Sequence, residues 1–400
     1  MIQHQAFFEA LGSMDDTSAE WRAGLAGLSV MRLIERAFGG TDLIGVTASD
    51  IQASRAAVEA VGKGDPARAI LLRVLDHLDR PIRLSKELGW DLVAYGRALD
   101  LAGKWPLAAN VFDTVARVFP ENTHPRTVIE ASTLLGAAAR SSGDWDASNR
   151  AYTRAEHLAA RIGDRGLFLT AQVGLAISQM IRGNLPAAEE ELDKVIEDAT
   201  DERIEPVLQI ALHGRATVAH YQGDFQKAIH LAYRSMEMTT NPSARERLLA
   251  DIAAAYAELG MRDVARKAYS IVAITSPHQW VRWQSVLNMM ELAIQEHDES
   301  EYDELSRQIE GAALDPKLQA YALYYRALGA RVFARPEAES DFDAAQSYAE
   351  SNKLNQLAFQ IENARKEIPA PPPSATPSDD LLEIAEMIEH LRDQVRIGSG

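Results

Sequence analysis

The sequence predicts an all-α fold, a solenoid of stacked antiparallel helix pairs. Six glycines recur along the chain at intervals of 39, 40, 40, 40 and 37 residues: Gly64, Gly103, Gly143, Gly183, Gly223 and Gly260. A small residue precedes each glycine by seven positions, at Ala57, Gly96, Gly136, Ala176, Ala216 and Ala253. A fixed period with small residues at a matched offset is typical of a repeat protein, in which each unit contacts mainly its neighbours.

The composition supports one folded repeat domain and limits the function. Hydrophobic residues make up 46% and charged residues 25% of the 400 residues, as in folded soluble chains. The net charge of −17 disfavours nucleic acid and anionic membrane surfaces as partners. The chain has no cysteine, which excludes disulfides and thiolate zinc sites. Because no apolar run reaches about 18 residues and the first residues do not read as a secretory signal, we expect a cytoplasmic protein.

The clearest copy of the repeat runs from residue 89 to residue 120. A first apolar helix face, a glycine turn and a second apolar face follow one another, and Pro120 ends the copy: Leu92, Tyr95, Gly96 and Leu99, then Gly103, then Ala108, Phe112 and Val115. Small residues at the crossing let two helix backbones approach closely. The turn glycine supplies a left-handed conformation that a side chain penalises by about 1 kcal/mol. The residues after three of the glycines, Asp144, Asn184 and Asp224, are good helix N-caps.

This copy resembles the tetratricopeptide repeat, with Leu92 in place of the leading aromatic residue. The resemblance covers residues 50–351 and implies a right-handed α-solenoid whose first helices line a concave groove. The copies are longer than the 34 residues usual in the family, which implies longer helices or connectors and selects no subfamily.

The elements follow in order from this register. We expect an N-terminal helical cap at 1–48, about eight helix pairs at 49–351, a C-terminal capping helix at 352–367, a Pro-rich linker at 368–378 and an amphipathic tail helix at 379–397. The last two pairs, near 280–309 and 318–351, lack the turn glycine. Terminal repeats are often atypical because they close the stack.

The resemblance also implies which first-helix positions face the groove and contact a peptide. They are Trp90, Arg97, Glu130, Thr133, Arg140, Thr170, Met180, His213, Thr217, His220, Tyr221, Arg247 and Glu258. A carboxylate clamp for chaperone tails needs Lys and Asn at the fifth and ninth places of each unit. The fifth places here are Val93, Thr133, Val173, His213 and Ala250, which argues against that ligand. Each of these side chains has the alternative of being solvated or supporting a neighbouring helix.

No motif in the sequence predicts an enzyme, a metal or a cofactor. His213 and His220 lie two helical turns apart, roughly 10 Å, and therefore cannot share one zinc ion. The glycines at 62 and 64 lack the Lys-Ser/Thr pair and the preceding strand of a phosphate loop. The acidic runs at 189–191 and 298–301 are expected to be solvated helix faces or helix starts.

The tail helix carries an apolar seam of the kind found in short coiled coils: Leu381, Ile384, Ile388, Leu391 and Val395. An isolated helix of this length is marginal in water, so it needs a partner. The same helix in another copy, a different protein, and the chain's own groove all remain open, the last as autoinhibition. A loosely ordered tail is the remaining alternative.

The sequence thus predicts a scaffold that binds a peptide or a helical segment of a protein partner and that is regulated or assembled through its tail. The alternative is a ligand-gated sensor, in which a peptide or small molecule shifts the repeats between two forms. The first 45 or so residues carry no basic recognition helix of the kind that would give such a sensor a DNA-binding output.

Overall fold

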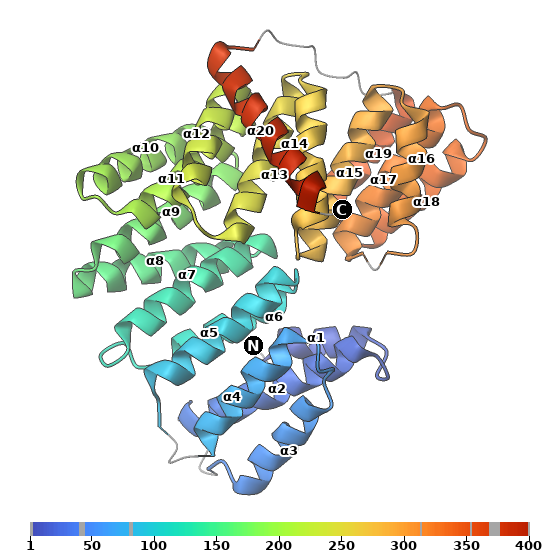
Figure 1. Ribbon diagram of the computed structural model, residues 1–400. Coiled ribbons are helices and arrows are strands. Elements are labelled where there is room, and N and C mark those ends of the chain that lie inside the picture. The colour runs from blue at the N-terminus through green and yellow to red at the C-terminus, as the bar shows by residue number, and fades with distance from the viewer. Residues whose placement is uncertain are drawn as a thin grey trace. The chain divides into compact units, whose positions relative to one another are not determined.

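The computed structural model describes residues 3–39, 45–79, 83–312, 314–352, 354–367 and 377–398. In these ranges all regular structure is helical, and consecutive helices pack against each other as an α-solenoid (Figure 1). Most of the expected linker at 368–378 lies outside the described residues. The chain divides into two compact units, Met1–Val207 and Leu208–Gly400, and the boundary falls inside α11 (Glu205–Tyr221).

Unit 1 contains two N-terminal helices and four helix pairs. Its helices are α1 (Gln5–Ser13), α2 (Ala19–Phe38), α3 (Ala48–Glu59), α4 (Pro66–Leu78), α5 (Lys86–Leu101), α6 (Trp105–Val118), α7 (Pro125–Ser141), α8 (Trp145–Ile162), α9 (Arg165–Ile181) and α10 (Leu185–Asp201). Helix α2 packs on α3, α4 and α6, and α1 packs on α2 and α6, so the two helices cover the start of the stack.

Unit 2 continues the pairs and ends in two further helices. Beyond α11 these are α12 (Phe225–Met238), α13 (Pro242–Glu258), α14 (Arg262–Thr275), α15 (Gln279–Gln295), α16 (Glu299–Ile309), α17 (Pro316–Val332), α18 (Ala338–Ser351), α19 (Asn355–Lys366) and α20 (Asp379–Gly398). Helix α19 packs on α17 and α18, whereas α20 lies on α14 and α12.

The small residues at the helix crossings are required by aromatic side chains from the second helix. A Cβ added to Gly96 would lie 2.4 Å from the ring of Phe112, and one added to Gly136 would lie 2.7 Å from the ring of Tyr152. Both rings are buried. The sequence spacing therefore marks the points where α5 meets α6 and α7 meets α8.

The turn glycines behave as predicted at five of the six positions. Gly103, Gly143, Gly183, Gly223 and Gly260 have φ between 72° and 87°. Gly64 does not take this conformation, because the connection between α3 and α4 runs over residues 60–65 and turns without it. In the two pairs that lack the glycine, His297 (φ 57°) and Ala334 (φ 53°) adopt the same left-handed turn.

The predicted helix caps are confirmed at two of three positions. The Asp144 and Asp224 side chains accept hydrogen bonds from the backbone N–H of Ala147 (2.9 Å) and Lys227 (3.1 Å). Asn184 precedes α10 but its side chain makes no capping hydrogen bond, so the prediction is wrong there.

Candidate protein-binding surfaces

The predicted binding residues divide between the two units. In unit 1, Trp90 on α5 is 52% exposed, and the ammonium group of Lys86 lies 4.6 Å from its ring centroid. Arg97 on α5 forms an ion pair with Glu130 on α7, with 3.1 Å between Nη2 and Oε1. Trp90, Arg97 and Glu130 therefore lie on the accessible surface of consecutive first helices.

The other predicted residues of unit 1 contact their own helix or the second helix of their pair, or are buried. Arg140 donates a hydrogen bond of 2.9 Å to the hydroxyl of the buried Tyr152. The hydroxyls of Thr133 and Thr170 donate to backbone oxygens one turn earlier, at 2.9 Å and 2.8 Å. Met180 is buried and offers a partner no surface. These side chains support the stack, which is the alternative that the sequence left open.

In unit 2, one polar contact between a predicted residue and a neighbour joins the first helices α11 and α13. The imidazole Nε2 of His213 lies 2.7 Å from Oδ2 of Asp251. Thr217 donates to the backbone oxygen of His213 at 3.1 Å, and His220 packs edge-on against Phe225 with ring centroids 5.3 Å apart. Among the described residues no three His, Cys, Asp or Glu side chains are placed to hold a metal ion.

A small cavity of about 250 Å³ opens beside these residues, where α11, α12 and α13 meet. Thr217, His220 and Tyr221 line it from α11, and the other lining residues are Ala216, Ala228, Ala232, Asp251 and Ala254. Half of its lining residues are alanines, so a side chain of a bound segment has room to enter. At its edge the Tyr221 side chain is 64% exposed.

Sequence reasoning missed the groups that lie further along this surface, on α15 and α17. The Tyr325 hydroxyl donates a hydrogen bond of 2.8 Å to Oε2 of Glu291. The ring of Tyr325 is also stacked with that of Tyr321, with centroids 6.2 Å apart, and it lies 5.2 Å from that of Tyr324. These pairs lack the turn glycine, so the register that located the other groove positions stopped at α13. The run of tyrosines at 321–325 was the available signal.

The electrostatics place Glu258, Glu291 and the tyrosines in one neighbourhood. Burial raises the pKa of Glu291, the charge of Glu258 raises it further, and the Tyr325 hydroxyl opposes the shift. Burial also raises the pKa of Tyr321, and the charge of Glu291 and the Tyr221 hydroxyl raise it further. In the part of the chain that the structure describes, neither Glu258 nor Glu291 forms an ion pair. We call Tyr221, Asp251, Glu258, Glu291 and Tyr321 the tyrosine–carboxylate surface.

Arg247 lies on the same face of α13, one turn before Asp251, and is exposed. The surface therefore has a basic end at Arg247 and an acidic end at Glu258 and Glu291. A bound segment with charges of both signs has one orientation in which each charge meets its opposite.

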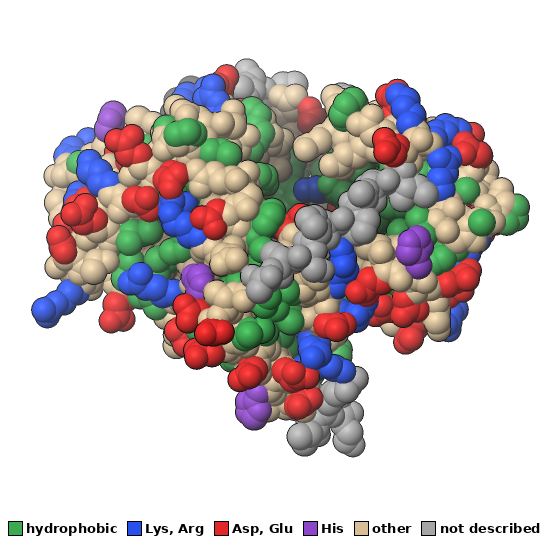
Figure 2. All heavy atoms as spheres, turned by 90° about the horizontal axis from the view of Figure 1, so that it is seen from above, with side chains coloured by type: hydrophobic (Ala, Val, Ile, Leu, Met, Phe, Trp, Pro, Cys, Tyr) green, Lys and Arg blue, Asp and Glu red, His purple; other side chains and the backbone are tan. Residues whose placement is uncertain are grey.

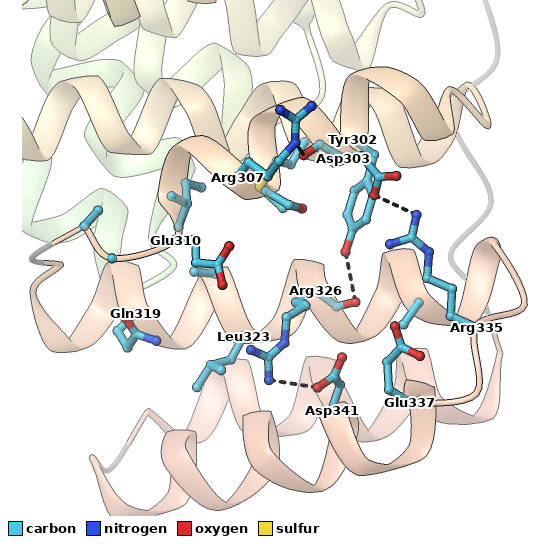
Figure 3. A pocket seen from close by; sticks show the side chains of 17 residues that line it. Tyr302, Asp303, Arg307, Glu310, Gln319, Leu323, Arg326, Arg335, Glu337 and Asp341 are labelled. Carbon is cyan, nitrogen blue, oxygen red and sulfur yellow. Dashed lines mark hydrogen bonds and ion pairs between the residues drawn. The ribbon is translucent and has the colours of Figure 1, made fainter.

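A larger cavity, of about 750 Å³, lies between α16, α17 and the start of α18 (Figure 3). Helix α16 has only 11 residues, fewer than the 14 of α14 or α18, and so leaves space over α17. The charged groups that line the cavity pair across its opening: Arg326 with Asp341 at 2.8 Å, and Arg335 with Asp303 at 2.7 Å. The Tyr302 hydroxyl donates to the backbone oxygen of Arg326 at 3.2 Å. These contacts hold α16, α17 and α18 together around the cavity.

The tail helix α20 lies on the second helices α12 and α14 of its own unit (Figure 1). Leu381, Ile384 and Ile388 are 0%, 5% and 0% exposed, whereas Leu391 and Val395 are half-buried. The buried Tyr256 hydroxyl donates a 2.7 Å hydrogen bond to the backbone oxygen of Leu381. Of the open alternatives, the structure shows docking on the same chain, on the second helices α12 and α14 and, through Tyr256, on the end of the first helix α13.

On the face shown in Figure 2, basic side chains are interspersed with acidic ones rather than gathered into a basic patch. None of the helices in the described ranges combines the length and apolar character needed to cross a membrane.

Comparison with known proteins adds little beyond the fold. No family model matches the sequence, and no curated protein matches it significantly. A solved structure of a Rap protein complexed with competence and sporulation factor is similar at a TM-score of 0.47 and 12% identity, over 94% of this chain and 100% of that chain. A shared function does not follow from a likeness this distant. What stands is the architecture: this chain is an all-α solenoid built of antiparallel helix pairs.

Proposed function

We propose that this protein is an interaction scaffold, and not an enzyme, that binds a peptide or a helical segment of a protein partner on the tyrosine–carboxylate surface of unit 2. One observation carries the proposal: exposed Tyr221 and Asp251 line the cavity between α11, α12 and α13. Glu258, two turns after Asp251 on α13, and Glu291, whose pKa the charge of Glu258 raises, form no ion pair among the described residues. Tyrosines supply contact area at low entropic cost and are common anchors of interfaces.

The charges select the kind of segment. Glu258 and Glu291 favour a Lys or Arg side chain, whose ammonium or guanidinium group pairs with a carboxylate and stacks on tyrosine rings. Because a half-buried carboxylate is costly to leave unpaired, the cationic side chain gains more at Glu291 than at a fully solvated acid. The partner is therefore a segment with at least one basic residue among small or apolar ones.

A displayed peptide library panned against the full chain tests this proposal. We expect enriched sequences to contain Lys or Arg, and their binding, followed by fluorescence anisotropy, to weaken at least tenfold in Tyr221→Ala and Glu258→Gln. Glu304→Gln, an exposed acid on α16, is the matched control and leaves binding unchanged. Equal binding to all of these proteins contradicts the proposal.

A ligand-gated sensor is a second candidate, favoured by one observation. Ala228 and Ala232 of α12 line the cavity, and α12 is also one of the two helices on which α20 lies. A segment that fills the cavity thus contacts a helix that holds the tail. Hydrogen exchange in α20 that changes on peptide binding supports the sensor, and exchange that does not change supports the passive scaffold.

A further inference from the structure

The tail helix α20 is an addition to the repeat architecture rather than a member of it. Helix α14 packs on α13 and α15, and α12 packs on α13, so both second helices have neighbours within the repeat besides α20. Within unit 1, the second helix α6 is also covered by α1 and α2, whereas α8 is packed by its neighbours α7 and α9 with no added helix among the described residues. The repeat alone therefore does not require a cover over α12 and α14.

The surface under α20 differs in its chemistry from the corresponding surface of α10. Lys267 on α14 is paired with Glu389 on α20, with 2.7 Å between Nζ and Oε1. Val264 and Ile271 lie three and four residues from Lys267 and share its helix face. On α10, by contrast, the exposed positions include Glu190 and Glu197. An apolar stripe with one central lysine is suited to an amphipathic helix that carries an acidic residue.

Helix α20 packs tightly on this surface in its first half and loosely in its second half. Leu381, Ile384 and Ile388 in the first half of α20 are buried, whereas Leu391 in the second half is only half-buried. Ile274, two turns beyond Lys267 on the same face of α14, is 58% exposed. The apolar stripe of α14 thus extends past the tightly docked part of α20 and leaves an apolar contact unused.

We propose that the outer surface of α12 and α14 is a helix-binding site, separate from the tyrosine–carboxylate surface, whose resident occupant α20 is exchangeable. The occupant that replaces it is an amphipathic helix of a partner protein, with the apolar spacing of Leu381, Ile384 and Ile388 and an acidic residue opposite Lys267. A tethered helix competes at an effective concentration of about 1 mM. A partner helix overcomes this advantage by also covering Ile274.

A synthetic, fluorescein-labelled peptide of residues 377–398 is the probe. It is titrated into the full chain and into a full-length variant with Ile384→Asp and Ile388→Asp, which removes the resident helix from its site. We expect the peptide to bind the variant at least tenfold more tightly than the unmodified chain. Adding Lys267→Glu to the variant weakens binding, and a peptide with Glu389→Lys restores it. The proposal is overturned if the peptide binds the unmodified chain and the folded variant equally tightly, or if it binds neither.

A second measurement does not depend on the variant's folding. In the unmodified chain, an exchangeable α20 exchanges its amide hydrogens at least tenfold faster than α13. An excess of the unlabelled 377–398 peptide, extended by a leucine that can reach Ile274, speeds the exchange of α20 further. Equal protection of α20 and α13 shows a permanent core helix and overturns the proposal. A concentration-dependent dimer that Ile388→Asp abolishes assigns the site to a second copy's tail instead, and also overturns it. Tyr221→Ala leaves every one of these readings unchanged, which separates this site from the proposed function.

Discussion

At the residue scale, His297 and Ala334 adopt the left-handed turn conformation that glycine adopts in most other copies of the repeat. Ala334 has φ 53° between α17 and α18. A Cβ in this conformation costs roughly 1–2 kcal/mol, which exceeds the backbone entropy that glycine loses on folding. We expect Ala334→Gly to raise the free energy of unfolding by up to about 1 kcal/mol. Ala344→Gly, the same change at an exposed position inside α18, should lower it by about 1 kcal/mol. Urea denaturation of both variants checks the prediction, which fails if the two changes have the same sign.

At a helix crossing, replacing glycine by alanine should destabilise the protein. The Cβ of Gly96→Ala would lie 2.4 Å from the ring of buried Phe112, so the ring or helix α6 must shift. Overpacking of this kind costs about 1–3 kcal/mol, more than the gain in helix propensity of about 1 kcal/mol. Gly12→Ala in α1 meets nothing within 4 Å and should keep that gain. Thermal unfolding of the pair distinguishes the effects, and equal melting temperatures would show that Phe112 yields at no cost.

The raised pKa of Glu291 makes stability depend on pH with a definite sign. A carboxyl whose folded-state pKa lies above its ordinary value of 4.5 binds more protons when folded. The free energy of unfolding therefore falls as pH rises from about 4.5 through the raised folded-state pKa of Glu291. Above the folded-state pKa the loss is complete. Glu291→Gln keeps the acceptor for the Tyr325 hydroxyl but removes the charge. We expect this variant to be more stable than the native chain at pH 7 and equal to it near pH 4, by urea denaturation. A difference that does not vary with pH would refute this.

Glu291 also shows where sequence reasoning stopped. The glycine register located Tyr221, which lines the cavity, and His213, whose imidazole contacts the lining residue Asp251. It also located Glu258, whose charge raises the pKa of Glu291. It did not extend to α15 or α17, because the turns after these helices are made by His297 and Ala334. A register defined by glycine cannot extend past a turn that has none, although the backbone conformation is the same.

At the element scale, helix starts that look alike in sequence are predicted to differ in stability. Asp144 accepts a hydrogen bond from the N–H of Ala147, whereas the Asn184 side chain makes no capping hydrogen bond. Replacing a working cap by alanine costs about 1 kcal/mol, within a range of 0.5–2. Asp144→Ala should show this loss in the free energy of unfolding, and Asn184→Ala should show little. Equal losses would mean that the Asn184 side chain caps α10 in solution.

The tail helix separates what an element's own sequence determines from what it does not. Its apolar spacing predicted an amphipathic helix in need of a partner, and the buried side chains of Leu381, Ile384 and Ile388 agree with that spacing. The surface it occupies depends on Lys267 and Tyr256, more than a hundred residues earlier. A periodic pattern encodes a helix face, but the complementary face can come from any other part of the chain.

At the scale of the whole molecule, the fold was predictable because a solenoid repeats one local solution. Each crossing and turn is set within about forty residues, so the spacing of small residues marked six of the eight helix pairs. The division of the chain into two compact units had no such signal, since it falls within α11 in the middle of a regular copy. The candidate surface is likewise a product of several helices, and only those in register with the glycines could be read.

The same local character predicts how damage spreads through the molecule. In a repeat stack, stability is approximately a sum of unit stabilities and nearest-neighbour interfaces, so a defect weakens its own pair and the adjoining ones. Gly96→Ala, at the contact of α5 with α6, should therefore accelerate amide exchange in α4–α7. It should leave α17, α18 and α19 unchanged, because local openings involve contiguous cooperative segments. Native-state hydrogen exchange with mass spectrometry resolves these peptides. Uniform acceleration across the chain would show a single cooperative structure instead, and the additive description of the helix pairs would then be wrong.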